Sequence, residues 1–492
     1  MRRLLALAVM LLAVVPVFAG PAPAMVAQDV PVFTQDFPPA EFAQRREAVY
    51  DAIGPQGIAL VQGAPSPPGF VRFRQSNEFY YLCGVETPHA YLLMDGVARR
   101  SHLFLPSHDA RRAASEGGLL TANDPAAAVE LTGVDEVHDV GALADHLGKF
   151  AGAADVPTLF VPFAPAEGAS GTRGMAGRTA GDIAADPWDG RLSRGEQLVA
   201  LVKERHPELE IEDLSPTLDR LRLIKSPREI ALIRRATQLS GQAIVEAMRS
   251  TEPGLMEYEI DGLARFIFYR NGAQGEAYYS LVASGPNAWW AHYHAGQRRM
   301  QDGDLVLLDF GPDVGYYSAD LTRQWPVNGE FNEWQRELYG FYLGFYKAIL
   351  HNIRPGDVQA IKQDAVRDME HLLSTWEFTK PHYRTAAEDF VQSYRLSAGR
   401  PGGSLGHGVG MAVHDVGNSD GVLTSGMVFT IEPQFRVPEE QIYIRLEDMI
   451  LVTEDGVEIL SDFVPMDMDD VEATIAEEGL LQRYPGLPWK RR

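Results

Sequence analysis

The sequence predicts an α/β domain over residues 36–216, followed by an α+β domain over residues 222–465. Three observations lead to this prediction. The chain has 492 residues, which is too long for one ordinary core, so about two to three domains are expected. Its first half alternates helix-like and strand-like runs, as α/β domains do. Its second half places amphipathic helices between apolar strand-like runs that are joined by turns.

The first 24 residues differ in character from the rest of the chain. Residues 1–24 begin with Met-Arg-Arg, continue as an apolar run too short to span a membrane comfortably, and end at Ala22-Pro-Ala24. This order is typical of a secretory signal peptide. We expect an exported protein, periplasmic or secreted, with no membrane attachment after cleavage. An uncleaved membrane anchor is the alternative.

The net charge limits the classes of binding partner, and the cysteine content limits the covalent cross-links. The chain has 67 acidic and 44 basic residues and a formal net charge of −23. Nucleic acid and anionic membranes are repelled by such a surface, so neither is an expected partner. Cys83 is the only cysteine, which excludes an intrachain disulfide, and its apolar neighbours predict a buried side chain.

The α/β domain is predicted to begin with a helix at 41–53. Its strands are predicted at 57–62, 91–94, 102–105 and 158–162. The segment 164–190 is rich in Gly, Ala and Thr, and this composition predicts a long surface loop without catalytic residues.

The α+β domain begins at a helix-start signal. Ser226 and Glu229 fit a capping box, with Pro227 at the first helical position, and apolar residues at helical spacing continue to Met248. Further helices are predicted at 256–269, 332–351 and 361–376. Residues 466–492 are assigned to a C-terminal tail.

Two acidic residues lie in a predicted β-hairpin. The strand-like runs around Asp309 and Asp320 are separated by the turn-like segment Pro312-Asp-Val-Gly315. Both residues are equally distant from the Val314/Gly315 junction, so we expect them to face each other across the hairpin. Opposed like charges are destabilising unless a positive group lies between them.

The arrangement recurs in a second predicted hairpin, which contains Glu432 and Glu447 on either side of a Pro438-Glu-Glu turn. Between the two hairpins lies His407, flanked by glycines that permit close backbone approach. Unpaired charges in apolar strands are costly, and a metal centre is the simplest compensation.

One imidazole and four carboxylates form a hard, oxygen-rich ligand set. Such a set suits Mn²⁺, with Zn²⁺ or Co²⁺ as alternatives. Four carboxylates carry more negative charge than one divalent ion balances, so we expect two ions about 3.5–4 Å apart.

Five short motifs in the second half share one order of ligand types. They are Leu-Asp309-Phe-Gly, Ser-Ala-Asp320-Leu-Thr-Arg, Gly-His407-Gly, Thr-Ile-Glu432-Pro and Arg-Leu-Glu447-Asp. Together they resemble the motifs of the pita-bread-fold metallopeptidases, and most of all those of aminopeptidase P, over about residues 220–465. The segments around Asn77 and His102 bear a weaker resemblance to the amino-terminal domain of aminopeptidase P and prolidase.

The resemblance assigns a role to each ligand. Asp320 and Glu447 would bridge the two metals, Asp309 would chelate one of them, and His407 with Glu432 would complete the other. A hydroxide between the metals would attack the peptide carbonyl, with Glu432 as the proton shuttle.

Two further histidines match family positions that flank the scissile bond. His292 in Trp-Trp-Ala-His-Tyr and His414 in Val-His-Asp would stabilise the developing oxyanion and help to protonate the leaving nitrogen. A hydrogen-bonding role in the core is the alternative for His414.

Two arginines near the ligands are expected to differ in role. Arg445 lies two residues before Glu447, so its side chain should share that strand face and orient this bridging carboxylate or meet a substrate terminus. Arg323 follows Asp320 by three residues and should therefore face the other way, in a structural role.

Two positions depart from the family pattern. Gly403 stands four residues before the ligand histidine, where relatives usually carry another histidine. His294-Ala-Gly296 follows His292-Tyr293, where relatives usually have asparagine, and His294 is expected to face solvent. Both positions shape the substrate pocket in relatives, so they concern substrate preference rather than metal binding.

The resemblance implies a dinuclear metal aminopeptidase acting on peptides with proline in the second position. A prolidase that cleaves Xaa-Pro dipeptides is the alternative, because it would use the same five ligands. A non-enzymatic pita-bread binding protein and a metal-independent, creatinase-like amidinohydrolase fit the intact ligand set less well. Relatives often form dimers or tetramers, which implies a homo-oligomer.

Overall fold

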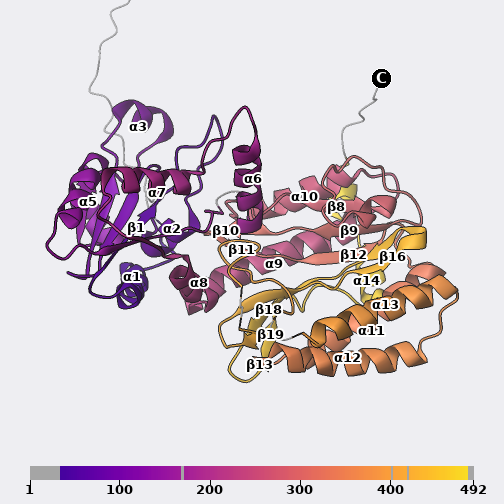
Figure 1. Cartoon of the computed structure of the whole chain (residues 1–492). Coiled ribbons are helices and arrows are strands. Elements are labelled where there is room, and N and C mark those ends of the chain that lie inside the picture. The colour runs from indigo at the N-terminus through magenta and orange to yellow at the C-terminus, as the bar shows by residue number, and fades with distance from the viewer. Residues whose placement is uncertain (1–33, 168–170, 401–402, 418–419, 486–492) are drawn as a thin grey trace, which may run out of the picture.

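The computed structural model describes residues 34–167, 171–400, 403–417 and 420–485. Figure 1 shows the amino-terminal domain on the left and the carboxy-terminal domain on the right, with α8 (Ser215–Leu223) at their junction. The expected signal peptide, residues 1–24, lies outside the described residues. In the described part of the chain, no helix is both long and apolar enough to cross a membrane.

The amino-terminal domain contains one six-stranded sheet with the order β4-β3-β2-β1-β5-β6. Its strands are β1 (Gly57–Gln62), β2 (Tyr91–Asp95), β3 (Arg100–Leu105), β4 (Glu136–Asp139), β5 (Thr158–Val161) and β6 (Ile211–Asp213). Strand β2 runs antiparallel to both of its neighbours, β1 and β3, whereas β4 pairs in parallel with β3, β5 with β1, and β6 with β5. The four predicted strands are confirmed, each to within two residues at either end.

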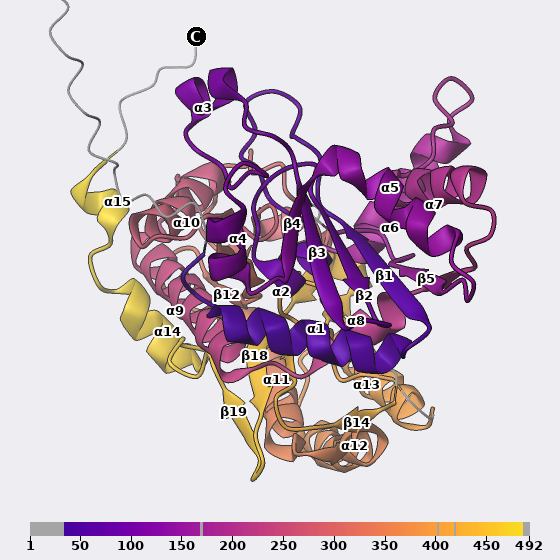
Figure 2. The same ribbon diagram turned by 90° about the vertical axis from the view of Figure 1, so that its left-hand side faces the viewer.

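Helices cover both faces of this sheet, as an α/β domain requires. One face packs on α1, α2 and α4, and the other on α5 and α7, so that neighbouring residues such as Leu60 and Val61 belong to different cores. Figure 2 shows α1 in front of the sheet. The helices are α1 (Pro39–Ile53), α2 (Asn77–Cys83), α3 (Ala110–Glu116), α4 (Pro125–Thr132), α5 (Leu143–Ala151), α6 (Arg173–Ala185) and α7 (Arg194–Arg205). Cys83 is buried, as predicted.

The prediction of a loop over 164–190 is wrong, because this segment contains α6. Thr172 caps the helix by accepting a hydrogen bond from the Met175 backbone N–H. Arg173 then forms ion pairs with Glu78 at 2.8 Å and Asp219 at 2.6 Å. Capping and tertiary ion pairs outweigh the weak helix propensity of a Gly-rich sequence, and Glu78 and Asp219 both lie far from Arg173 in the chain.

The carboxy-terminal domain begins at the predicted capping box. The Ser226 hydroxyl accepts a hydrogen bond from the Glu229 N–H, and the Glu229 carboxylate accepts one from the Ser226 N–H, with Pro227 in the first turn. The helices are α9 (Pro227–Ser250), α10 (Glu257–Arg270), α11 (Glu333–Asn352), α12 (Val358–Thr375), α13 (Pro381–Ala398), α14 (Met468–Ile475) and α15 (Leu480–Arg483). The predicted helices are confirmed.

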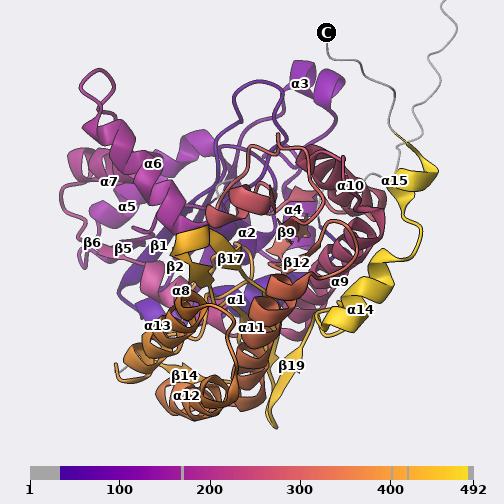
Figure 3. The same cartoon turned by 90° about the vertical axis from the view of Figure 1, so that its right-hand side faces the viewer.

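Short antiparallel sheets lie between these helices. The strands are β7 (Gly275–Glu276), β8 (Leu281–Ser284), β9 (Leu305–Asp309), β10 (Pro312–Val314), β11 (Tyr317–Ser318), β12 (Thr322–Pro326), β13 (Gly356–Asp357), β14 (Val422–Leu423), β15 (Val428–Ile431), β16 (Phe435–Val437), β17 (Ile442–Ile444), β18 (Asp448–Val452) and β19 (Val457–Ile459). Figure 3 shows α11, α12 and α13 grouped on one side, and the ring of Phe390 on α13 packs 5.3 Å from Phe435 on β16. Helices α14 and α15 lie along α9 in Figures 2 and 3.

The first hairpin has a different register from the predicted one. Strand β9 pairs with β12 so that Asp309 lies opposite Thr322, and Asp320 is displaced by two residues. The two-residue turn is Gly315-Tyr316, with φ of 58° and 74°, which moves the turn centre one residue further along the chain. A displacement of two residues keeps the side chain on the same face, so the two aspartates still approach each other diagonally.

The second hairpin has the predicted register. Ile431 pairs with Asp448, and Phe435 pairs with Ile444. Counting inward from these two pairs places Glu432 opposite Glu447. The predicted turn at residues 438–440 is present as a short 3₁₀ helix.

The two domains meet through buried charges and aromatic contacts. Arg222, which is 1% exposed, pairs with Glu78 at 2.8 Å and with Asp415 of the carboxy-terminal domain. We call Arg222, Glu78 and Asp415 the interdomain ion cluster. Tyr316, in the turn of the first hairpin, stacks on Tyr80 of α2 with ring centroids 3.6 Å apart.

Candidate metal centre

The five predicted ligands converge on one place in the carboxy-terminal domain. Ligand atoms of Asp309, Asp320 and Glu447 lie within 4.8 Å of one another, and so do those of His407, Glu432 and Glu447. We call these five residues the carboxylate cluster. Glu447 belongs to both groups of three, so its carboxylate connects the two sets of possible metal ligands.

The imidazole of His407 lies next to three of the carboxylates. Its Nε2 atom is 3.4 Å from Asp320 Oδ2, 3.5 Å from Glu432 Oε1 and 3.8 Å from Glu447 Oε1. Its Nδ1 lies 3.2 Å from the Gly408 carbonyl oxygen, and donation there leaves Nε2 free to bind a cation. The predicted close approach is also present, because a Cβ on Gly406 would lie only 1.7 Å from the Thr430 carbonyl oxygen.

The electrostatics of the cluster favour a further positive charge beside that of Arg445. Burial, together with the Asp309 charge, raises the pKa of Asp320 well above its usual value. Burial and the Asp320 charge do the same to the pKa of Glu447. Glu447 Oε1 is buried without a hydrogen-bond partner among the described residues. Divalent cations remove both problems, because they stabilise the ionised carboxylates and provide Oε1 with a ligand bond. The residues therefore fit a metal centre.

Arg445 contacts the carboxylate cluster, as its position on the strand predicts. Its guanidinium bonds Asp309 and lies 3.1 Å from Glu432 Oε2, so it touches these two carboxylates rather than its neighbour Glu447. Arg323 faces away and forms a fully buried ion pair with Asp448 at 2.6 Å, which agrees with a structural role.

The predicted histidines lie at the exposed side of the cluster. The His414 ring stacks on His407 with centroids 3.9 Å apart. Loss of solvent around the ring, followed by the charges of His407 and His292, lowers the pKa of His414 to about 4. His414 is therefore neutral at neutral pH and donates from only one ring nitrogen. His292 is exposed, and His294 is exposed as predicted.

The sequence reasoning missed two hydroxyl groups that contact the cluster. The Tyr278 hydroxyl lies 2.7 Å from Asp309 Oδ1 and also bonds Asp320. Thr322 donates to Glu447 Oε2 at 2.7 Å. Thr322 could have been found, because it follows Asp320 by two residues on a strand and thus shares its face. Tyr278 carries no comparable signal.

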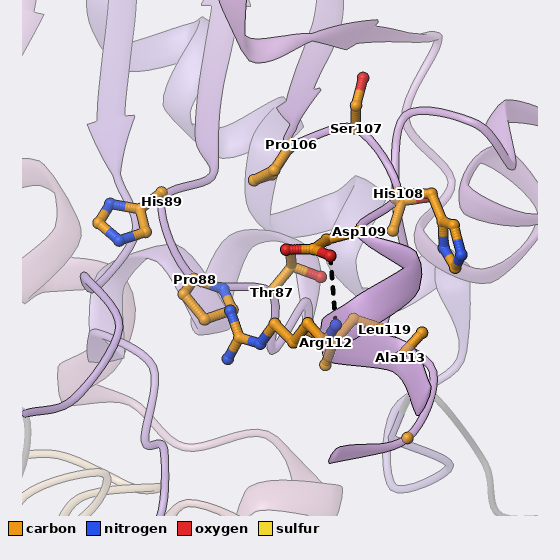
Figure 4. A pocket seen from close by; sticks show the side chains of 12 residues that line it. Thr87, Pro88, His89, Pro106, Ser107, His108, Asp109, Arg112, Ala113 and Leu119 are labelled. Carbon is orange, nitrogen blue, oxygen red and sulfur yellow. Dashed lines mark hydrogen bonds between the residues drawn. The ribbon is translucent and has the colours of Figure 1, made fainter. Parts of the chain in front are cut away.

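A pocket of about 260 Å³ lies elsewhere, in the amino-terminal domain. Figure 4 shows that Asp109 and Arg112 project into it, and the Asp109 carboxylate accepts a hydrogen bond from the Arg112 N–H at the start of α3. None of its lining residues belongs to the carboxylate cluster.

Comparisons with known proteins agree with this architecture. The family model described as metallopeptidase family M24 matches residues 231–454, and the aminopeptidase P amino-terminal domain matches residues 42–160. An Xaa-Pro aminopeptidase of Escherichia coli (strain K12) is 31% identical over 455 residues, which cover 88% of this chain and 97% of that protein. An Xaa-Pro dipeptidase of Pyrococcus furiosus is 28% identical over 272 residues, or 54% of this chain and 70% of that protein.

A solved structure shares the fold across both domains. The structure of Escherichia coli aminopeptidase P with the inhibitor Pro-Leu has a TM-score of 0.70 and 28% sequence identity, and the match covers 89% of this chain and 98% of that chain. The predicted pairing of an aminopeptidase P amino-terminal domain with a pita-bread catalytic domain is confirmed. The chain belongs to metallopeptidase family M24, in its aminopeptidase P group.

Proposed function

We propose that this protein is an Xaa-Pro aminopeptidase that uses two divalent metal ions, and that Mn²⁺ is the native metal. The observation that carries the proposal is the pair of ligand groups that share Glu447. The oxygen-rich donor set supports Mn²⁺.

Each part of the cluster has a chemical task in this proposal. Divalent ions, when bound, polarise a peptide carbonyl and lower the pKa of a water molecule toward neutrality. Glu432 is the most solvent-accessible of the four carboxylates, with 22% of its side chain exposed, so it can accept a proton and pass it to the leaving nitrogen. Arg445 holds Glu432 and Asp309 in place, and neutral His414 donates a hydrogen bond to the substrate.

Domain coverage favours an aminopeptidase over a dipeptidase. The match to the Pyrococcus furiosus dipeptidase covers 54% of this chain, whereas the match to the Escherichia coli aminopeptidase covers 88%. The amino-terminal half also reaches the exposed side of the cluster, where Thr172 forms a β-bridge with His414.

We expect the purified enzyme to release the first residue of an Xaa-Pro-Xaa tripeptide when Mn²⁺ is supplied. The assay compares this tripeptide with an Xaa-Pro dipeptide and with a tripeptide that has alanine in place of proline. Exclusive hydrolysis of the dipeptide would show a prolidase instead, and equal hydrolysis of the alanine peptide would contradict the proline preference.

Glu432→Gln is expected to lower kcat by about 10²-fold, because an amide cannot accept the transferred proton. The overall fold should persist, since the amide has the same shape. The matched control is Glu439→Gln, an exposed glutamate in the turn of the same hairpin, which should keep wild-type activity. Full activity of Glu432→Gln, with an unchanged circular dichroism spectrum, would refute the proton-transfer role.

We also propose that the protein is exported. The basis is the sequence of residues 1–24, and the single buried cysteine is compatible with an oxidising compartment.

A further inference from the structure

Three histidines gather in the amino-terminal domain, outside the carboxylate cluster. His102 lies on β3, His138 on the edge strand β4 and His146 on α5. Each offers a ring nitrogen within 4.8 Å of the other two. Glu136, two residues before His138 on the same strand face, reaches into the group. We call these four residues the histidine cluster.

The spacing of the donor atoms matches one face of a tetrahedron. His102 Nδ1 is 3.2 Å from His138 Nε2 and 3.4 Å from Glu136 Oε2, and the last two atoms are 3.2 Å apart. Zinc binds nitrogen and oxygen at about 2.0–2.2 Å, which gives tetrahedral edges of about 3.3–3.6 Å. An ion placed just outside the plane of these three atoms therefore reaches all of them at bonding distance.

Two of the remaining polar atoms of these side chains, His146 Nδ1 and Glu136 Oε1, are held by other groups. His146 Nδ1 lies 2.9 Å from the Ala142 carbonyl oxygen, so it carries the proton and leaves Nε2 as the donor for a metal. Glu136 Oε1 pairs with Arg100 at 2.9 Å, which leaves Oε2 directed at the histidines. Orienting contacts of this kind usually surround metal ligands.

We propose that the histidine cluster is a second, structural metal site that binds Zn²⁺ through His102, His138, His146 and Glu136. Three imidazoles select zinc over manganese, in contrast to the oxygen-rich carboxylate cluster. Four protein ligands leave no open position, which fits a structural rather than a catalytic ion. The ion would fasten α5 to the edge of the sheet.

The first test is zinc content, measured by elemental analysis of the full chain after metal removal and dialysis against Zn²⁺. We expect the wild-type protein to hold about one more zinc per chain than the double variant His102→Ala/His138→Ala. Peptidase activity should be equal in both proteins, which shows that the carboxylate cluster remains loaded. The matched control is His108→Ala, an exposed histidine of the same domain, which should keep the wild-type zinc content.

Equal zinc content in the wild-type protein and the double variant would overturn the proposal. If the double variant does not fold, crystals of the wild-type protein grown with Zn²⁺ decide the question. An anomalous zinc peak between the three imidazole rings supports the site. Absence of that peak, when the carboxylate cluster shows its own peaks, overturns it and leaves a hydrogen-bonded histidine group without a metal.

Discussion

Asp320→Asn is expected to lower turnover of an Xaa-Pro peptide by about 10³-fold. Asp320 belongs to the ligand group with Asp309 and Glu447, and it also lies beside His407. Its loss therefore affects both proposed metal positions. Losing roughly 4 kcal/mol of transition-state stabilisation corresponds to this factor. Kinetic assays and elemental analysis of the same sample should show that activity and metal content fall together.

The same substitution is expected to stabilise the metal-free protein against unfolding. Burial and the Asp309 charge raise the pKa of Asp320 well above its usual value, so at neutral pH ionisation of this carboxyl costs stability in the folded state. Asparagine removes that cost, and the metal-free variant should unfold at a higher temperature than the metal-free wild type. Added Mn²⁺ should then stabilise the wild type but not the variant.

The matched control is Asp302→Asn, an exposed aspartate that bonds Asn328 at 2.7 Å. It should change neither activity nor metal content. Retained turnover in Asp320→Asn would exclude the proposed metal chemistry, whatever its effect on stability.

The second large effect is expected from Arg222→Met in the interdomain ion cluster, which should cost about 3–5 kcal/mol of unfolding free energy. Arg222 is almost fully buried and faces the carboxylates of Glu78 and Asp415. Methionine has a similar length but removes the cation that these two buried carboxylates share, and among the described residues it leaves only Arg173 beside Glu78 and Lys225 beside Asp415. Urea unfolding followed by tryptophan fluorescence measures the loss.

Arg220→Met is the matched control, because Arg220 is an exposed residue of the same helix and bonds only Thr217 among the described side chains. Its unfolding free energy should stay within about 0.5 kcal/mol of the wild type. Similar stability of the two variants would contradict the role given to the interdomain ion cluster.

The pH dependence of stability gives a second measure of this cluster. Burial opposes ionisation of Asp415, but the charges of Arg222 and Lys225 outweigh it and hold the pKa of Asp415 below its usual value. A carboxyl whose folded-state pKa is lowered stabilises the protein above its unfolded pKa of about 3.9, and that stability is lost as the pH falls through the folded value. Arg222→Met should therefore flatten the acid limb of the stability profile.

The sequence predicts the second hairpin better than the first for a structural reason. A proline at residue 438 fixes the turn of the second hairpin, and its register follows from counting outward. In the first hairpin Tyr316 adopts a positive φ beside Gly315, a conformation that is uncommon for tyrosine, so counting from the glycine alone placed the register wrongly. The predicted face of Asp320 is nevertheless confirmed, because the register is displaced by an even number of residues.

Other features could not be predicted because their members are far apart in the chain. Glu78, Arg222 and Asp415 come from three segments, and no local pattern connects them. Tyr278 reaches the carboxylate cluster from a segment that precedes the first hairpin, and its residue type alone indicates no ligand contact. Local periodicity reveals which face a residue occupies, but only the fold reveals what lies opposite.

The stack of Tyr316 on Tyr80 has a consequence for how this protein can be divided. The hairpin tip that carries Tyr316 inserts into the amino-terminal domain, where its hydroxyl also donates to Glu86 at 2.8 Å. Cutting the chain near residue 222 would expose that ring and release the tip that joins the Asp309 and Asp320 strands. We therefore expect neither domain to function when it is expressed alone, and truncation or domain-swap experiments should retain both halves.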